Sequence, residues 1–167
     1  MIITYESTRD QSLKNSPSQG ILEGISSDGG LYVVRGLKNM KVNLEEMVKK
    51  DYLTMGEEIL SLFLGDFTKE EIRSAMEKAY DQRFTHEEIT PLIKLKEGYV
   101  LELFHGPTSA FKDVALALLP KLMEEALKKT GKKEEIVILT ATSGDTGKAA
   151  LEGFKDADQI RMMVFYP

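Results

Sequence analysis

Several residue types and patterns that define other classes of protein are missing from these 167 residues. There is no cysteine, which excludes disulfides, thiol catalysis and thiolate metal sites. The only two histidines, His86 and His105, lie far apart in the sequence, so we expect no metal site. No apolar run approaches the roughly 20 residues that a membrane span needs, and the start, "MIITYESTRD", lacks the pattern of a secretory signal. We therefore expect a cytoplasmic protein without a membrane anchor.

An excess of basic residues is missing as well. The chain has 22 basic and 27 acidic residues, which gives a formal net charge of −5. A protein that binds nucleic acid usually presents a basic face, so no nucleic-acid partner is expected. Hydrophobic residues make up 42% and charged residues 29%, which is typical of a globular protein. The length suits one domain with a core, or one domain and a small appendage.

Residues 1–92 are predicted to form a mostly helical N-terminal region. Asn43 is a plausible N-cap, and Thr68 with Glu71 three residues later matches a capping box. Apolar residues recur at helical spacing after both positions. Residues 31–34 follow an Asp-Gly-Gly turn and are predicted to form a strand.

Residues 93–167 alternate between strand and helix patterns, which predicts the start of a doubly wound parallel α/β sheet. Strands are expected at 99–104, at 136–140 and from 160 onward, with the second buried on both faces. Pro120 lies inside the intervening helix, where we expect a kink or a break. The third strand has no helix after it and the sheet would be thin, so we expect this chain to be a portion of a longer protein.

The stretch "TATSGDTGKAA", residues 140–150, follows a strand and opens a helix. The carboxyl ends of strands are where open α/β sheets bind ligands, and a helix N-terminus favours an anion. The spacing of Gly144 and Gly147 fits neither a Walker A loop nor the dinucleotide fingerprint. Two interpretations fit the loop alone: a site for a carboxylate or a phosphate, or a capped helix that binds nothing.

The stretch "HGPTSAFKDVALALLP", residues 105–120, places Lys112 where an apolar helix begins. The helix dipole disfavours a cation there, and burial disfavours it further. Both effects favour the free amine that Schiff-base chemistry with an aldehyde requires. The alternative is a surface lysine in the first turn of a helix. Asp113 fits a carboxylate that complements the dipole, and His105, next to Gly-Pro, fits a structural role.

Four segments together resemble the threonine synthase family of fold-type II pyridoxal-phosphate enzymes. "YESTR" and "SQGILEGISSDGGLYV" are similar to the family's opening, and "LELFHGPTSAFKDVAL" is similar to its cofactor-lysine segment. "TATSGDTGKAALEGF" resembles the loop that contacts the substrate carboxylate. The segments occur in the family's order and at its approximate spacing.

The resemblance implies roles for residues of both central motifs. Lys112 would bind pyridoxal 5′-phosphate covalently and move protons, and Phe111 would pack close to the cofactor. Asp145 would lie near the cofactor ring; many relatives in the wider group have asparagine at that place. The residues implied to bind the substrate's α-carboxylate are Thr142, Ser143, Gly144, Asp145 and Thr146.

The implied reaction is that of a carbon–oxygen lyase acting on a phosphate ester, which converts O-phospho-L-homoserine and water into L-threonine and phosphate. Two alternatives stay open: another fold-type II lyase, such as a dehydratase, or a non-catalytic fragment or paralogue used for binding or assembly. The Asp-Gly-Gly-Leu-Tyr segment argues against a dehydratase, and the intact Lys112 argues against a degenerate copy. Family members are more than twice this length, so the isolated chain is expected to show little or no turnover.

Overall fold

The computed structural model describes residues 3–142 and 144–166 and divides into two compact units. Unit 1 comprises Met1–Met76 and Glu125–Lys132, and unit 2 comprises Glu77–Glu124 and Lys133–Pro167. The division between residues 92 and 93 that the sequence suggests stays a prediction. Within the described residues, no helix is both long and apolar enough to cross a membrane.

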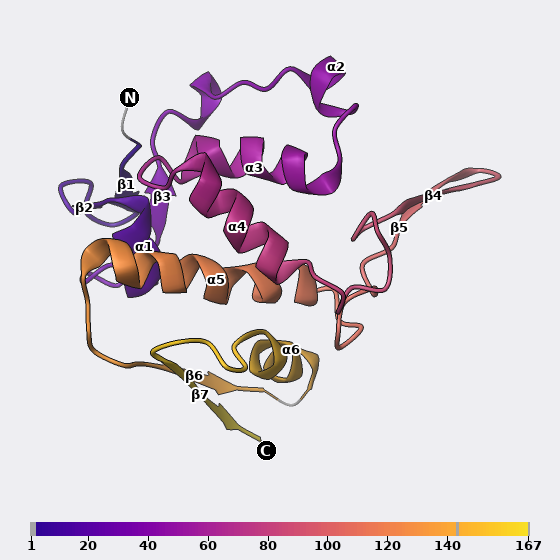
Figure 1. Cartoon of the computed structure of the whole chain (residues 1–167). Helices are drawn as coiled ribbons and strands as arrows, with labels where there is room; N and C mark the ends of the chain where they lie inside the picture. The colour runs from indigo at the N-terminus through magenta and orange to yellow at the C-terminus, as the bar shows by residue number, and fades with distance from the viewer. Residues whose placement is uncertain (1–2, 143, 167) are drawn as a thin grey trace. The chain divides into compact units, whose positions relative to one another are not determined.

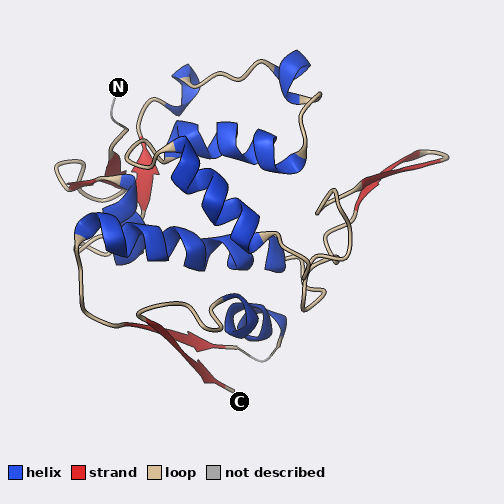
Figure 2. Ribbon diagram, viewed as in Figure 1, coloured by secondary structure: helices blue, strands red, loops and turns tan. Residues whose placement is uncertain are grey.

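Strands lie at both ends of the chain and around a central run of helices from α2 to α4 (Figure 1). The first eight elements are β1 (Tyr5–Ser7), β2 (Lys14–Asn15), α1 (Pro17–Glu23), β3 (Tyr32–Val34), the 3₁₀ helix η1 (Leu37–Asn39), α2 (Leu44–Met47), α3 (Tyr52–Phe63) and α4 (Lys69–Ala79). The remaining six are β4 (Leu92–Leu95), β5 (Gly98–Leu101), α5 (Asp113–Thr130), β6 (Ile136–Ala141), α6 (Asp145–Gly153) and β7 (Ile160–Phe165). Helices dominate the stretch from α2 to α4 (Figure 2), whereas the strands β1, β2 and β3 precede it.

The first strands form a small antiparallel sheet in the order β2-β1-β3. A cluster of hydrogen bonds ties the Ser-Thr-Arg and Asp-Gly-Gly segments together at this sheet. The Ser7 hydroxyl lies 2.8 Å from both carboxylate oxygens of Asp28, and the Gly30 N–H donates to Asp28 Oδ1 at 2.9 Å. The Gly30 N–H, followed by the hydroxyl, holds the pKa of Asp28 below its ordinary value. Arg9 donates to the Asp28 carbonyl oxygen at 3.0 Å, so its guanidinium helps to fix the turn.

Helices α2 and α4 of unit 1 begin where the sequence places their capping residues. Asn43 accepts the N–H of Glu45, which confirms it as the N-cap of α2. Thr68 and Glu71 exchange both bonds of a capping box before α4, at 3.2 and 2.7 Å. Ile72 and Met76 follow on the core face of α4, and both are buried.

The strand predicted at 99–104 forms within unit 2, but it does not join a parallel sheet. β5 pairs with β4 in an antiparallel hairpin, from Leu92 opposite Leu101 to Leu95 opposite Gly98. The hairpin was not expected because its two-residue loop, Lys96-Glu97, lacks the Asn-Gly or Asp-Gly signal of tight hairpins.

The other two predicted strands, β6 and β7, pair in parallel from Ile136 opposite Ile160 to Ala141 opposite Phe165. Helix α6 packs on one face of the pair, where Gly147 lies against Val164 and Thr142. The expectation that the first of these strands is buried on both faces is wrong for this structure. Leu139 is 64% exposed and Phe165 is 56% exposed, because they point away from the face that α6 covers.

Of the kink or break expected at Pro120, the break does not occur, because helix α5 runs continuously from Asp113 to Thr130. Pro120 is buried and lacks the N–H that would bond to the carbonyl oxygen of Leu116. The last residue of α6, Gly153, lies against that carbonyl oxygen, and a Cβ at Gly153 would overlap it. Gly153 therefore approaches α5 at the Leu116 carbonyl oxygen, which receives no hydrogen bond from Pro120.

Candidate functional site

Two junctions between a loop and a helix meet in unit 2. One is the loop from Gly106 to Lys112, which leads into α5; the other lies between β6 and α6. Both stretches were predicted from the sequence as candidate sites. Lys112 of the first stretch and Thr146 of the second are 34 residues apart in the sequence. The fold brings them together because the carboxyl end of β6 and the start of α6 lie beside the start of α5.

The amine of Lys112 is the point at which the two stretches touch. Its Nζ donates a hydrogen bond to Thr146 Oγ1 at 2.6 Å, and it lies 5.0 Å from the centroid of the Phe111 ring. Lys112 itself is half-buried, whereas Phe111 is 63% exposed. The Lys112 amine is therefore oriented by a hydroxyl and flanked by an exposed aromatic face.

The loop after β6 supplies the N-terminus of α6. Gly144 is the N-cap of α6 and has no side chain that could cap it. Thr142 Oγ1 accepts the N–H of Gly144 at 3.3 Å, and Asp145 is exposed in the first turn of the helix. Ser143, also predicted as a site residue, lies outside the described residues. The end of α6 that favours an anion therefore lies beside the Lys112 amine.

Of the predicted residues, the described contacts join Lys112 with Phe111 and Thr146. Thr142, Gly144 and Asp145 lie on the same loop and helix start, and within the described part of the chain none of the three forms a hydrogen bond with the amine. Their roles in binding a cofactor or a substrate stay predictions.

The structure adds partners for Asp113 and His105 that the sequence did not identify. Asp113 is only 2% exposed, and it accepts hydrogen bonds from Thr108 rather than standing as a free carboxylate at the helix start. His105 Nε2 lies 2.8 Å from Glu102 Oε2, and His105 Nδ1 lies 3.1 Å from Thr85 Oγ1, which is a structural arrangement.

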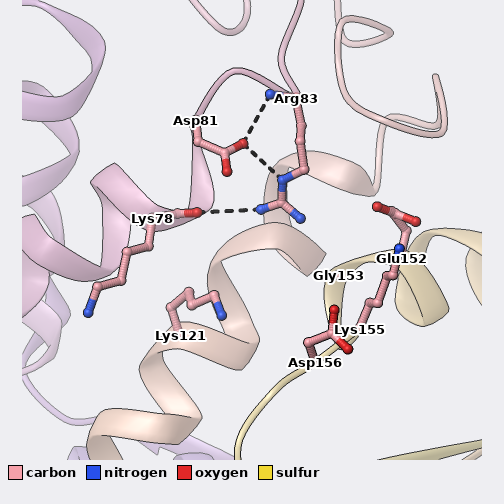
Figure 3. A pocket seen from close by; sticks show the side chains of 8 residues that line it. All are labelled: Lys78, Asp81, Arg83, Lys121, Glu152, Gly153, Lys155 and Asp156. Atoms are coloured by element: carbon pink, nitrogen blue, oxygen red, sulfur yellow. Dashed lines mark hydrogen bonds and ion pairs between the residues drawn. The ribbon is translucent and has the colours of Figure 1, made fainter.

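A hollow of about 420 Å³ in unit 2, of which Lys112 is not a lining residue, is lined by charges of both signs (Figure 3). Its Arg83 Nε donates to Asp81 Oδ1 at 2.8 Å, and Arg83 also reaches the carbonyl oxygen of Lys78. Burial raises the pKa of Asp81. The hydrogen bonds that it accepts from the Arg83 guanidinium and from the Arg83 backbone N–H lower it by more, so the pKa lies below its ordinary value. Arg83 and Asp81 therefore neutralise each other within this hollow. The described residues contain no group of three or more His, Cys, Asp or Glu side chains that could hold a metal.

Comparison with known proteins connects this geometry to one family. Residues 4–80 match the family model described as the threonine synthase N terminus. The chain is 39% identical to threonine synthase of Pseudomonas aeruginosa, over 98% of this chain and 35% of that protein. It is 36% identical to threonine synthase of Schizosaccharomyces pombe, over 99% of this chain and 34% of that protein.

A solved structure agrees with the sequence matches. The crystal structure of PLP-bound threonine synthase from Brucella melitensis superposes with a TM-score of 0.87 at 35% identity, and the match covers 99% of this chain and 36% of that one. The chain thus spans about a third of the length of the relatives that it matches. In sequence and in fold, the chain is similar to about a third of these threonine synthases, and its residues 4–80 match the model of their N terminus.

Proposed function

We propose that this chain contributes the cofactor lysine and the substrate-carboxylate loop of a threonine synthase, a carbon–oxygen lyase that converts O-phospho-L-homoserine and water into L-threonine and phosphate. The observation that carries the proposal is the 2.6 Å hydrogen bond from Lys112 Nζ to Thr146 Oγ1. It joins the two motifs that the reaction needs at one place. Because the chain spans about a third of its relatives' length, the isolated chain is proposed to bind cofactor without appreciable turnover.

The residues around the Lys112 amine fit pyridoxal 5′-phosphate. The Lys112 amine is half-buried and held by a neutral hydroxyl rather than by a carboxylate, so it can react with an aldehyde. The exposed ring of Phe111 offers an apolar face beside that amine, and Asp145 lies at the neighbouring helix start. When bound, the cofactor supplies an electron sink for negative charge at the substrate's Cα.

The chain's own groups have separable tasks in this proposal. Lys112 Nζ holds the cofactor and then carries protons to and from the substrate's carbon atoms. Thr146 Oγ1 orients that amine through the bond that it already accepts. The N-terminus of α6, with Thr142, Gly144 and Asp145 and together with Ser143, binds the substrate's α-carboxylate through N–H and hydroxyl donors.

The proposal also includes the setting of the reaction. The partner is a small phosphorylated amino acid, without a nucleic acid or a membrane, and the location is the cytoplasm. Residues 1–92 form the N-terminal region, and residues 93–167 begin the domain that binds the cofactor.

A chimera tests the reaction. Residues 1–167 replace the matching segment of the Pseudomonas aeruginosa threonine synthase, and phosphate release from O-phospho-L-homoserine is measured. We expect release that Lys112→Ala abolishes and Lys121→Ala, a lysine on the same helix, leaves intact. Formation of a 2-oxo acid from serine or threonine in place of phosphate release would favour a dehydratase. A folded chimera without either activity would favour a non-catalytic chain.

A further inference from the structure

Asp113 is a buried carboxylate whose two oxygens both bind the same residue of the preceding loop. Its Oδ2 accepts the backbone N–H of Thr108 at 2.7 Å, and its Oδ1 accepts the Thr108 hydroxyl at 2.6 Å. Asp113 is only 2% exposed, so these bonds are shielded from water. Gly106 packs against the same side chain so closely that a Cβ there would overlap Asp113.

The loop that Asp113 grips contains a strained residue. Ser109 has a φ of +59°, a left-handed backbone conformation that residues other than glycine rarely adopt. The N–H of Ser109 donates to the Gly106 carbonyl at 3.1 Å, and the N–H of Asp113 donates to the Ala110 carbonyl at 3.0 Å. Strained backbone persists where the surrounding contacts over-determine it, and the two bonds from Thr108 to Asp113 close this loop.

The loop leads directly to the reactive amine. Lys112 is the neighbour of Asp113, and its carbonyl accepts the N–H of Leu116 in the first turn of α5. Its side chain reaches Thr146, whereas the carboxylate of Asp113 binds Thr108. A loop that relaxed between Ser109 and Lys112 would move the Lys112 backbone and weaken the bond from Nζ to Thr146.

We propose that Asp113 and Thr108 form a clamp that holds the strained loop and so positions the amine of Lys112. Both are positioning residues, because they act through the backbone of Lys112. The relevance of this clamp to catalysis rests on the proposed function, but its effect on the amine does not, because the contacts exist in the chain without cofactor.

Carbon-13 reductive methylation of the full chain, followed by NMR, reads the surroundings of each lysine amine without cofactor. The Lys112 signal is assigned with Lys112→Arg, and its position is compared in Thr108→Val and in Thr108→Ser. Valine keeps the shape of threonine and the backbone bond but removes the hydroxyl bond, whereas serine keeps both. Asp113→Ala, which removes both bonds, is the second variant, and circular dichroism confirms that each variant is folded.

We expect the Lys112 signal to move toward its position in urea in Thr108→Val, further in Asp113→Ala, and not at all in Thr108→Ser. The signal of Lys121, which pairs with Glu124 on the same helix, should not move. An unchanged Lys112 signal in folded Thr108→Val and Asp113→Ala would overturn the clamp. So would a joint shift of both lysines, which indicates a general distortion, or a wild-type Lys112 signal already at its urea position. Failure of the chain to bind pyridoxal phosphate would leave these signals readable and would count against the proposed function alone.

Discussion

Substituting Gly153 with alanine should destabilise the chain more than any ordinary surface change. The added Cβ would overlap the carbonyl oxygen of Leu116 and approach its carbonyl carbon to 2.8 Å. These are backbone atoms of α5, so neither can rotate away as a side chain would. Overpacking of this kind costs about 1–3 kcal/mol, and a backbone obstacle places the cost toward the upper end. Alanine regains at most about 0.5–1 kcal/mol over glycine in a helix.

The net loss predicted for Gly153→Ala is therefore about 2 kcal/mol in the free energy of unfolding. With a urea dependence of about 1–3 kcal/mol per molar, the midpoint monitored by circular dichroism should fall by about 1 M. Gly98→Ala is the control, because an added Cβ there meets no atom within 4 Å. A midpoint for Gly153→Ala equal to or above that of the wild type would refute the close approach of α6 to α5 at Leu116.

Two other predictions concern the N-terminal sheet and the site. Because the folded-state pKa of Asp28 lies below its unfolded value, its contribution to stability is present above the unfolded pKa and is lost as the pH falls through the folded pKa. Between about pH 5 and about pH 3, the urea midpoint of the wild type should thus fall more than the urea midpoint of Asp28→Asn. An equal fall in the two proteins would contradict a stabilising role of the Asp28 carboxylate. Thr146→Val should reduce borohydride-trapped cofactor on Lys112 several-fold, whereas Thr146→Ser should not; equal trapping in both would exclude orientation of the amine by the hydroxyl.

Local signals in the sequence predicted the helix starts well. The N-cap Asn43 and the capping box of Thr68 and Glu71 depend on residues three or fewer positions apart, so their partners can be read from the sequence. The hairpin of β4 and β5 was not predicted, because its loop carries no strong turn residue and its strands are too short for a clear alternation. The exposed face of β6 could not be predicted either, since a continuous apolar run does not say which faces are covered.

The site was predicted from motifs whose chemistry is local, namely a lysine at a helix start and a Ser/Thr/Gly loop after a strand. Their meeting at Lys112 and Thr146 could be expected from the α/β pattern, but the 2.6 Å bond required the structure. The clamp was missed because a carboxylate at a helix start has an equally good local explanation in the helix dipole. The structure shows that Thr108 is the partner of Asp113, because Asp113 is buried and the loop turns at Ser109.

The central claim, that Lys112 is the cofactor lysine, can be measured directly on this chain. The chain is mixed with pyridoxal phosphate, reduced with borohydride and digested, and the modified lysine is located by mass spectrometry, with Lys112→Ala and Lys121→Ala compared in parallel. We expect one dominant modified peptide containing Lys112, which disappears in Lys112→Ala and persists in Lys121→Ala. Labelling spread evenly over the chain's lysines, and unchanged in Lys112→Ala, would contradict it.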